Sequence, residues 1–127
     1  MAADGSSLLI DRIGGNEKLV LFLKNFYATV RVHSLIGPIF EEIIEDWPAH
    51  IEKIAGFWSL QMGGPSNYRG GLMARHFPLS LRAEHFDAWL GLWETSSRAH
   101  FDAPESQEVI QLAQTFRQRM EPMLTRR

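Results

Sequence analysis

The sequence predicts an all-α protein. Apolar residues recur at steps of three and four along several stretches, the spacing that places them on one face of a helix. No stretch shows the period-two alternation of apolar and polar residues that a half-buried strand requires. Glycine, proline and aspartate separate the helical stretches at positions typical of helix ends. With 127 residues, of which 45% are hydrophobic, the chain has the size of one domain with a single core.

The first long helix is predicted from Asn16 to about Val32. The Gly14-Gly15 pair breaks the chain before it, and Asn16 is of a residue type that caps helix N-termini. Tyr27 lies beside the apolar stripe, so its side chain is expected to reach the interior. The stripe itself consists of Leu19, Phe22, Phe26 and Val30.

A corner and a second long helix follow. The Gly37-Pro38 pair predicts a corner with a short helical turn after it. Asp46 is expected to cap the next helix, with Pro48 in the first turn, where its missing N–H costs little. Gly63-Gly64-Pro65 predicts the end of this helix. The helix has one continuous face, which is formed by His50, Ile54, Phe57 and Trp58. This face is apolar apart from His50.

The second half of the chain holds two further predicted helices. A glycine-rich loop and a brief segment, residues 66–77, end at Pro78. The helix from about Leu81 to Phe101 carries one apolar side: Phe86, Trp89, Leu90 and Trp93. Asp102, with Glu105 three residues later, predicts the start of the last helix. The expected buried positions of that helix are Val109, Ile110, Ala113, Phe116 and Met120.

Composition excludes several classes of protein. The absence of cysteine excludes disulfides, thiolate nucleophiles and cysteine-ligated metal centres. The net charge of −2 and the lack of a Lys/Arg cluster argue against nucleic acid as a partner. No apolar run reaches the length of roughly 20 residues that a membrane span requires, and residues 1–7 lack the basic start of a signal peptide. We therefore expect a cytoplasmic protein with no membrane and no nucleic-acid partner.

Two of the five histidines are candidate ligands. His33, His85 and His100 are expected to be solvated or to cap helix ends. His50 begins an otherwise apolar stripe, and His76 lies between a glycine-rich loop and a proline in an aromatic neighbourhood. From these features alone, an ordinary core or boundary histidine is the commoner interpretation of each. No HExxH pair, phosphate loop or nucleophile–base set offers a competing site.

The order of several segments resembles the truncated haemoglobins. These segments match, in turn, that family's second helix, the corner after it, the distal helix, the short proximal segment and the next helix: Phe26–Val30, Leu35–Phe40, Trp47–Trp58, Met73–His76 and Phe86–Trp93. The match runs from about residue 13 to residue 120. The corner and His50 are most similar to group III, whereas the Gly-Gly-Pro-x-x-Tyr loop, residues 63–68, is similar to group II.

The resemblance implies a two-over-two helical sandwich that encloses haem b. It implies a single haem-binding domain over residues 1–127, with 1–12 and 121–127 as less ordered tails. His76 would ligate the iron, and Tyr27, His50 and Trp89 would face the bound ligand on the distal side. Residues expected to pack against the porphyrin are Phe40, Ile54, Phe57 and Phe77, and those expected to meet its propionates are Lys53, Tyr68 and Arg75. Side chains of these kinds also fill ordinary helical cores and solvated faces.

The function implied is reversible binding of O2 and of other small ligands (CO, NO, cyanide) at the iron. A pocket with several hydrogen-bond donors suits sequestration or redox chemistry better than rapid oxygen transport. Peroxidase-like or NO-detoxifying turnover is the alternative, and it would require an unidentified reductase as partner. Two hypotheses from other functional classes stay open: a cofactor-free helical interaction module, and a histidine-ligated metal site without porphyrin.

Overall fold

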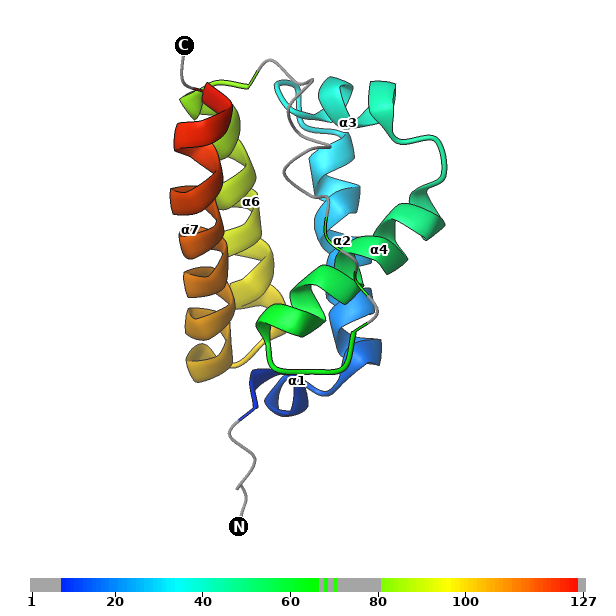
Figure 1. The fold of residues 1–127 in the computed structure, drawn as a ribbon, viewed down its shortest axis with the longest axis vertical. Helices are drawn as coiled ribbons and strands as arrows, with labels where there is room; N and C mark the ends of the chain where they lie inside the picture. Colours follow the sequence, from blue (N-terminus) through cyan, green and yellow to red (C-terminus); the bar gives the residue numbers. More distant parts are fainter. Residues whose placement is uncertain (1–7, 67, 69, 71–80, 126–127) are drawn as a thin grey trace.

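The computed structural model describes residues 8–66, 68, 70 and 81–125. Residues 124 and 125 are described by their backbone alone. Over these residues the chain is helical, and it contains no strand. The helices are α1 (Leu9–Arg12), α2 (Asn16–Arg31), α3 (Gly37–Ile43), α4 (Trp47–Gln61), α6 (Ala83–His100) and α7 (Ala103–Thr125) (Figure 1). None of the helices in the described part of the chain has the length and apolar character needed to span a membrane.

Two pairs of helices form the body of the molecule. Helices α6 and α7 run antiparallel side by side, while α4 crosses α2 on the other side (Figure 1). The pairs meet where α2 packs on α6. Trp93 of α6 is fully buried at this junction, and its indole N–H donates to the Val109 carbonyl at 3.0 Å. Phe22 and Phe26 of α2 contact the Trp93 ring edge-on, with centroids 5.0 and 5.1 Å away.

The N-cap of helix α2 lies one residue before the predicted one. Gly15, not Asn16, is the N-cap, and no side chain caps this end. Gly14 and Gly15 both have a positive φ, 109° and 86°, which glycine adopts without steric cost. The turn from α1 into α2 therefore ends at Gly15, and Asn16 is already helical. The prediction of Asn16 as the cap was wrong for this reason.

The corner between α2 and α3 depends on Gly37. A Cβ at this position would lie 2.6 Å from the carbonyl oxygen of Arg31, so only glycine lets α3 start so close to the end of α2. The close crossing brings Phe40 of α3 against Tyr27 of α2, with ring centroids 5.6 Å apart. A residue of the candidate site is thus positioned by the backbone of the corner.

Helix α4 begins at the predicted cap. The carboxylate of Asp46 accepts a hydrogen bond from the Ala49 N–H at 3.0 Å, and Pro48 lies in the first turn. The chain leaves α4 through Gly63, whose φ is 86°. The cap at one end and the glycine at the other define the length of α4, whose apolar face lies between the two helix pairs.

Both ends of the described chain are helical within the ranges that were expected to be less ordered tails. Residues 9–12 form α1, in which Leu9 and Ile10 are buried. Arg12 pairs with Glu108 of α7 at 2.6 Å and so connects α1 to the last helix. Helix α7 continues to Thr125, five residues beyond the last buried position, Met120.

Candidate functional site

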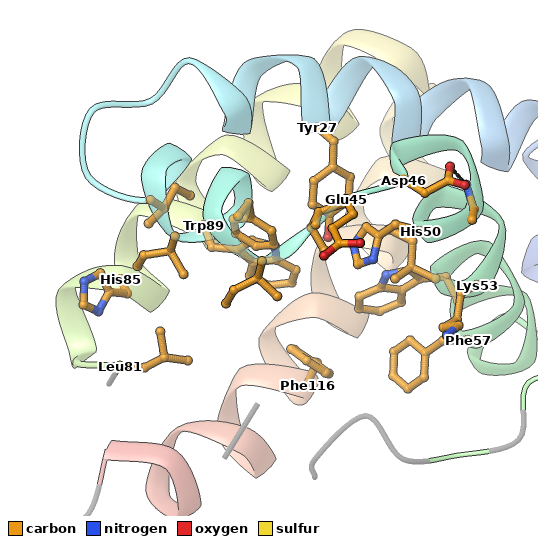
Figure 2. A pocket seen from close by; sticks show the side chains of 18 of the residues that line it. Tyr27, Glu45, Asp46, His50, Lys53, Phe57, Leu81, His85, Trp89 and Phe116 are labelled. Atoms are coloured by element: carbon orange, nitrogen blue, oxygen red, sulfur yellow. Dashed lines mark hydrogen bonds between the residues drawn. The ribbon is translucent and has the colours of Figure 1, made fainter. Parts of the chain in front are cut away.

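An apolar cavity of about 580 Å³ lies between the two helix pairs. Figure 2 shows side chains from α2, α4, α6 and α7 surrounding it, with Tyr27 and His50 on one side and Leu81 and His85 at the far edge. Its size falls within the range of ligand-binding pockets, which is roughly 300–1,000 Å³. The apolar lining includes Ile36, Ile39, Phe40, Ile43, Ile44, Ile54, Phe57, Trp58, Leu81, Phe86, Trp89 and Phe116.

Tyr27 lies on the inner face of α2, with 6% of its surface exposed. Burial raises the pKa of the Tyr27 hydroxyl, and the nearby Trp89 side chain lowers it by less. Tyr27 also lines the cavity, so its phenolic hydroxyl is available as a hydrogen-bond donor there.

His50 begins the cavity-facing side of α4. Its ring meets the Tyr27 ring edge-on, at a centroid distance of 5.8 Å and an interplanar angle of 86° (Figure 2). The ring of Trp47 packs on both His50 and Tyr27, with centroid distances of 5.6 and 5.7 Å. These contacts place the imidazole and the phenol together on one side of the cavity.

Trp89 approaches from the opposite helix pair. It is half-buried on α6, lines the cavity and stacks on Trp93, whose ring centroid is 5.3 Å away. Since Trp93 is fully buried and hydrogen-bonded to α7, this stack fixes the Trp89 ring from behind. Polar groups from α2, α4 and α6 therefore converge on one region of an otherwise apolar pocket.

The opposite wall of the cavity is aromatic and aliphatic. Phe57 of α4 and Phe116 of α7 contact each other on this wall, with ring centroids 5.7 Å apart. Phe116 was predicted as a buried core position of the last helix, but it is half-buried and lines the cavity. Phe40 and Ile54, expected to face a flat ligand, also line this space.

Tyr68 lines the cavity because the loop after α4 is bound back to that helix. The Ser66 hydroxyl donates to the Gly56 carbonyl at 2.6 Å and accepts from the Tyr68 N–H at 3.0 Å. The Ser59 hydroxyl donates to the Pro65 carbonyl at 2.7 Å, and the Tyr68 ring packs on Phe57. Tyr68 was predicted as a site residue, whereas a lone serine gives no sequence signal of such a bridge.

The rim of the cavity carries charged and polar side chains. Lys53, predicted to meet carboxylates, lines the cavity on α4, one turn after His50. Glu45 and Asp46 lie before the start of the same helix and also line the pocket, although neither was predicted there. His85 also lines the cavity, while its Nδ1 accepts the Arg82 N–H at 2.8 Å at the start of α6.

Three predicted site residues, Arg75, His76 and Phe77, lie outside the described residues. The nearest described neighbours on either side of this segment, Gly70 and Leu81, both line the cavity. Among the described residues, no three His, Cys, Asp or Glu side chains come together as a metal site.

A family model described as bacterial-like globin matches residues 8–122 of the sequence. The chain belongs to the bacterial-like globin family. A group 3 truncated haemoglobin of Campylobacter jejuni is 30% identical over 113 residues, which span 85% of this chain and 89% of that protein. A group 2 truncated haemoglobin of Bacillus subtilis is 35% identical over 81 residues, which span 60% of this chain and 59% of that one.

Solved structures show the same fold. The crystal structure of group III truncated haemoglobin from Campylobacter jejuni gives a TM-score of 0.83 at 29% identity and covers 88% of this chain and 92% of that one. The group II truncated haemoglobin from Bacillus anthracis gives 0.78 at 23% identity over 90% of each chain. The family and the two-over-two helical fold predicted from the sequence are confirmed, and this truncated globin is a haem protein by family.

The raised pKa of Tyr27 predicts a specific loss of stability in alkali. The folded chain holds this proton more tightly than the unfolded chain, in which the hydroxyl titrates near its ordinary pKa of 10.0. Above this pH the unfolded state gives up the proton first, so the free energy of unfolding falls by up to about 1.4 kcal/mol per pH unit.

Urea unfolding of wild type and Tyr27→Phe between about pH 9 and pH 11 measures this effect. The phenylalanine variant lacks the Tyr27 titration, so the difference in unfolding free energy between the two proteins is expected to change with pH only above about 10. A difference that stays constant over the whole range would contradict the burial of a protonated Tyr27.

Proposed function

We propose that this truncated globin binds haem b in the cavity, with His76 as iron ligand, and reversibly binds O2, CO, NO and cyanide there. The observation that carries the proposal is the convergence of Tyr27, His50 and Trp89 on one region of an apolar pocket. Such a pocket, with few and grouped polar side chains, is the typical form of a cofactor or small-ligand site.

The residues of the cavity fit a haem group. The walls are aromatic and aliphatic, as a flat tetrapyrrole requires, and Phe40, Ile54 and Phe57 are positioned to pack on its face and exclude water. Lys53 lies at the rim, where a cation suits propionate carboxylates, and Tyr68 can donate a hydrogen bond there. A chain without cysteine cannot form thioether links to haem, which favours the non-covalent b type.

The proposal for His76 rests on its place in the chain. It lies between Gly70 and Leu81, two residues that both line the cavity. Arg75 and Phe77 are its neighbours, and we propose them as a propionate contact and a porphyrin contact. When bound, haem supplies an iron atom whose open position takes up small gaseous ligands. The proposed haem domain covers residues 1–127.

The distal side chains supply hydrogen bonds to such a ligand. Tyr27 is protonated at physiological pH, as a tyrosine ordinarily is, and burial raises its pKa further. Its hydroxyl and the indole N–H of Trp89, which also lines the cavity, are both hydrogen-bond donors. His50, in ring contact with Tyr27, offers a donor or an acceptor according to its tautomer.

Redox turnover is the second candidate function. The same grouped donors favour peroxidase-like chemistry or the conversion of NO, because each requires a polar ligand to be held in place. Sustained turnover would require an external reductase, which we propose as a partner. The reversible binding of ligands is the step that both functions share.

Replacing the proposed iron ligand tests the haem assignment. His76→Ala is expected to lose stable haem while keeping helical content, since only the iron–imidazole bond is removed. The matched control is His85→Ala, which removes an imidazole from the far edge of the same cavity. Haem absorbance per protein and far-ultraviolet circular dichroism measure both effects. An unchanged haem spectrum in His76→Ala, or its loss only in His85→Ala, would overturn the assignment of His76.

Replacing the distal donors tests their role in ligand retention. Tyr27→Phe is expected to raise the rate of O2 dissociation from the ferrous protein by about ten- to a hundred-fold, the factor for a charge-assisted hydrogen bond of roughly 1.5–3 kcal/mol. Trp89→Phe is expected to act in the same direction, because it removes the second hydrogen-bond donor that lines the cavity beside Tyr27. Stopped-flow mixing of the oxygenated protein with CO measures these rates. Rates equal to wild type in both variants would show that these side chains do not contact the ligand.

A further inference from the structure

Trp47 lies directly behind the distal side chains. It is half-buried and is not among the residues that line the cavity. Its ring packs on Tyr27, His50 and Phe40, at centroid distances of 5.7, 5.6 and 6.4 Å. The position of this one indole therefore affects three residues that line the cavity from three different helices.

Hydrogen bonding does not fix the Trp47 ring. The indole N–H is buried and has no hydrogen-bond partner in the part of the chain that the structure describes. A buried donor without a hydrogen-bond partner is uncommon, and it lowers the stability of the folded state. The ring must then be held by contacts to its faces and edges.

Arg31 supplies the contact on the outer face. Its guanidinium carbon lies 4.6 Å from the Trp47 ring centroid, within the range of a cation–π interaction. The Nε of the same guanidinium donates to the Glu41 carboxylate. Arg31 is the last residue of α2, Glu41 lies on α3, and Trp47 is the first residue of α4. One guanidinium thus connects the three helices that surround Tyr27 and His50.

We propose that Arg31, Glu41 and Trp47 form a clamp that positions Tyr27 and His50 in the cavity and thereby sets ligand retention. The three are positioning residues, because they act through the rings of Tyr27 and His50. The arginine and glutamate side chains are each 44% exposed, so the clamp is accessible to solvent at its outer end and closed by the indole at its inner end. The inference rests on the proposed function and deepens it.

Arg31→Gln is the central variant, since it removes the cation while keeping a long polar side chain. Glu41→Gln removes the ion pair but leaves a guanidinium to cover the indole. The matched control is Arg82→Gln, which makes the same charge change at the exposed Arg82–Glu84 pair at the start of α6. All variants are studied as full chains loaded with haem, and Trp47→Phe assigns the indole N–H resonance of Trp47.

Two readouts separate positioning from a general loss of stability. The first is the C–O stretch in the infrared spectrum of the CO-bound ferrous protein, which responds to the hydrogen-bond donors near the ligand. The second is the hydrogen exchange rate of the Trp47 indole N–H, measured by NMR. The O2 dissociation rate is recorded alongside them.

Arg31→Gln is expected to broaden the C–O stretch or shift it to higher frequency. It is also expected to raise O2 dissociation and Trp47 indole exchange by about two- to five-fold, the factor for a partly exposed cation–π contact. Glu41→Gln is expected to move the same quantities less, and Arg82→Gln to leave all of them at wild-type values. Equal behaviour of Arg31→Gln and Arg82→Gln would overturn the clamp. A wild type without a C–O band would instead overturn the proposed function, and the indole exchange would still decide whether the clamp exists.

Discussion

The cavity between the two helix pairs is the constraint on which the rest of the structure depends. Protein interiors are packed to crystal-like density, and voids larger than a water molecule are few. This chain of 127 residues nevertheless keeps an apolar space of about 580 Å³, a volume within the range of ligand-binding pockets. Side chains around such a space lack partner atoms on one side, so a bound group that fills it also completes the core. Binding of haem to the folded chain is therefore expected to stabilise the fold.

Buried aromatic side chains support the wall of the cavity that carries its polar groups. Trp93 joins α6 to α7 through its hydrogen bond to Val109, and Phe22 packs against it from α2. Trp89 stacks on this buried ring, so its position on the cavity wall is held from behind. Cavity-lining side chains are thus supported by residues that do not line the cavity themselves.

Sequence patterns predicted the helices and singled out several residues that line the cavity, and they failed where distant parts of the chain meet. Asp46 was recognisable as a cap because its hydrogen bond to Ala49 is local, whereas Asn16 was misplaced because the positive φ of Gly15 ends the preceding turn. Helical periodicity put Phe116 on an inward face but could not distinguish a packed core from a cavity wall. The place of His85 on the pocket and the contact of Arg31 with Trp47 arise from how helix ends approach one another, and no local motif records that approach.

The proposed haem pocket is tested most directly by titrating the full chain with haem and recording ultraviolet–visible absorption in the ferric, the reduced and the CO-bound states. Haem bound in this pocket should give an intense Soret band that saturates at one haem per chain and shifts both on reduction and on addition of CO. Such shifts would show an iron held by the protein with a position open to ligands. A well-folded helical sample with no saturable Soret band would contradict the haem pocket, and the cavity would then belong to a different ligand.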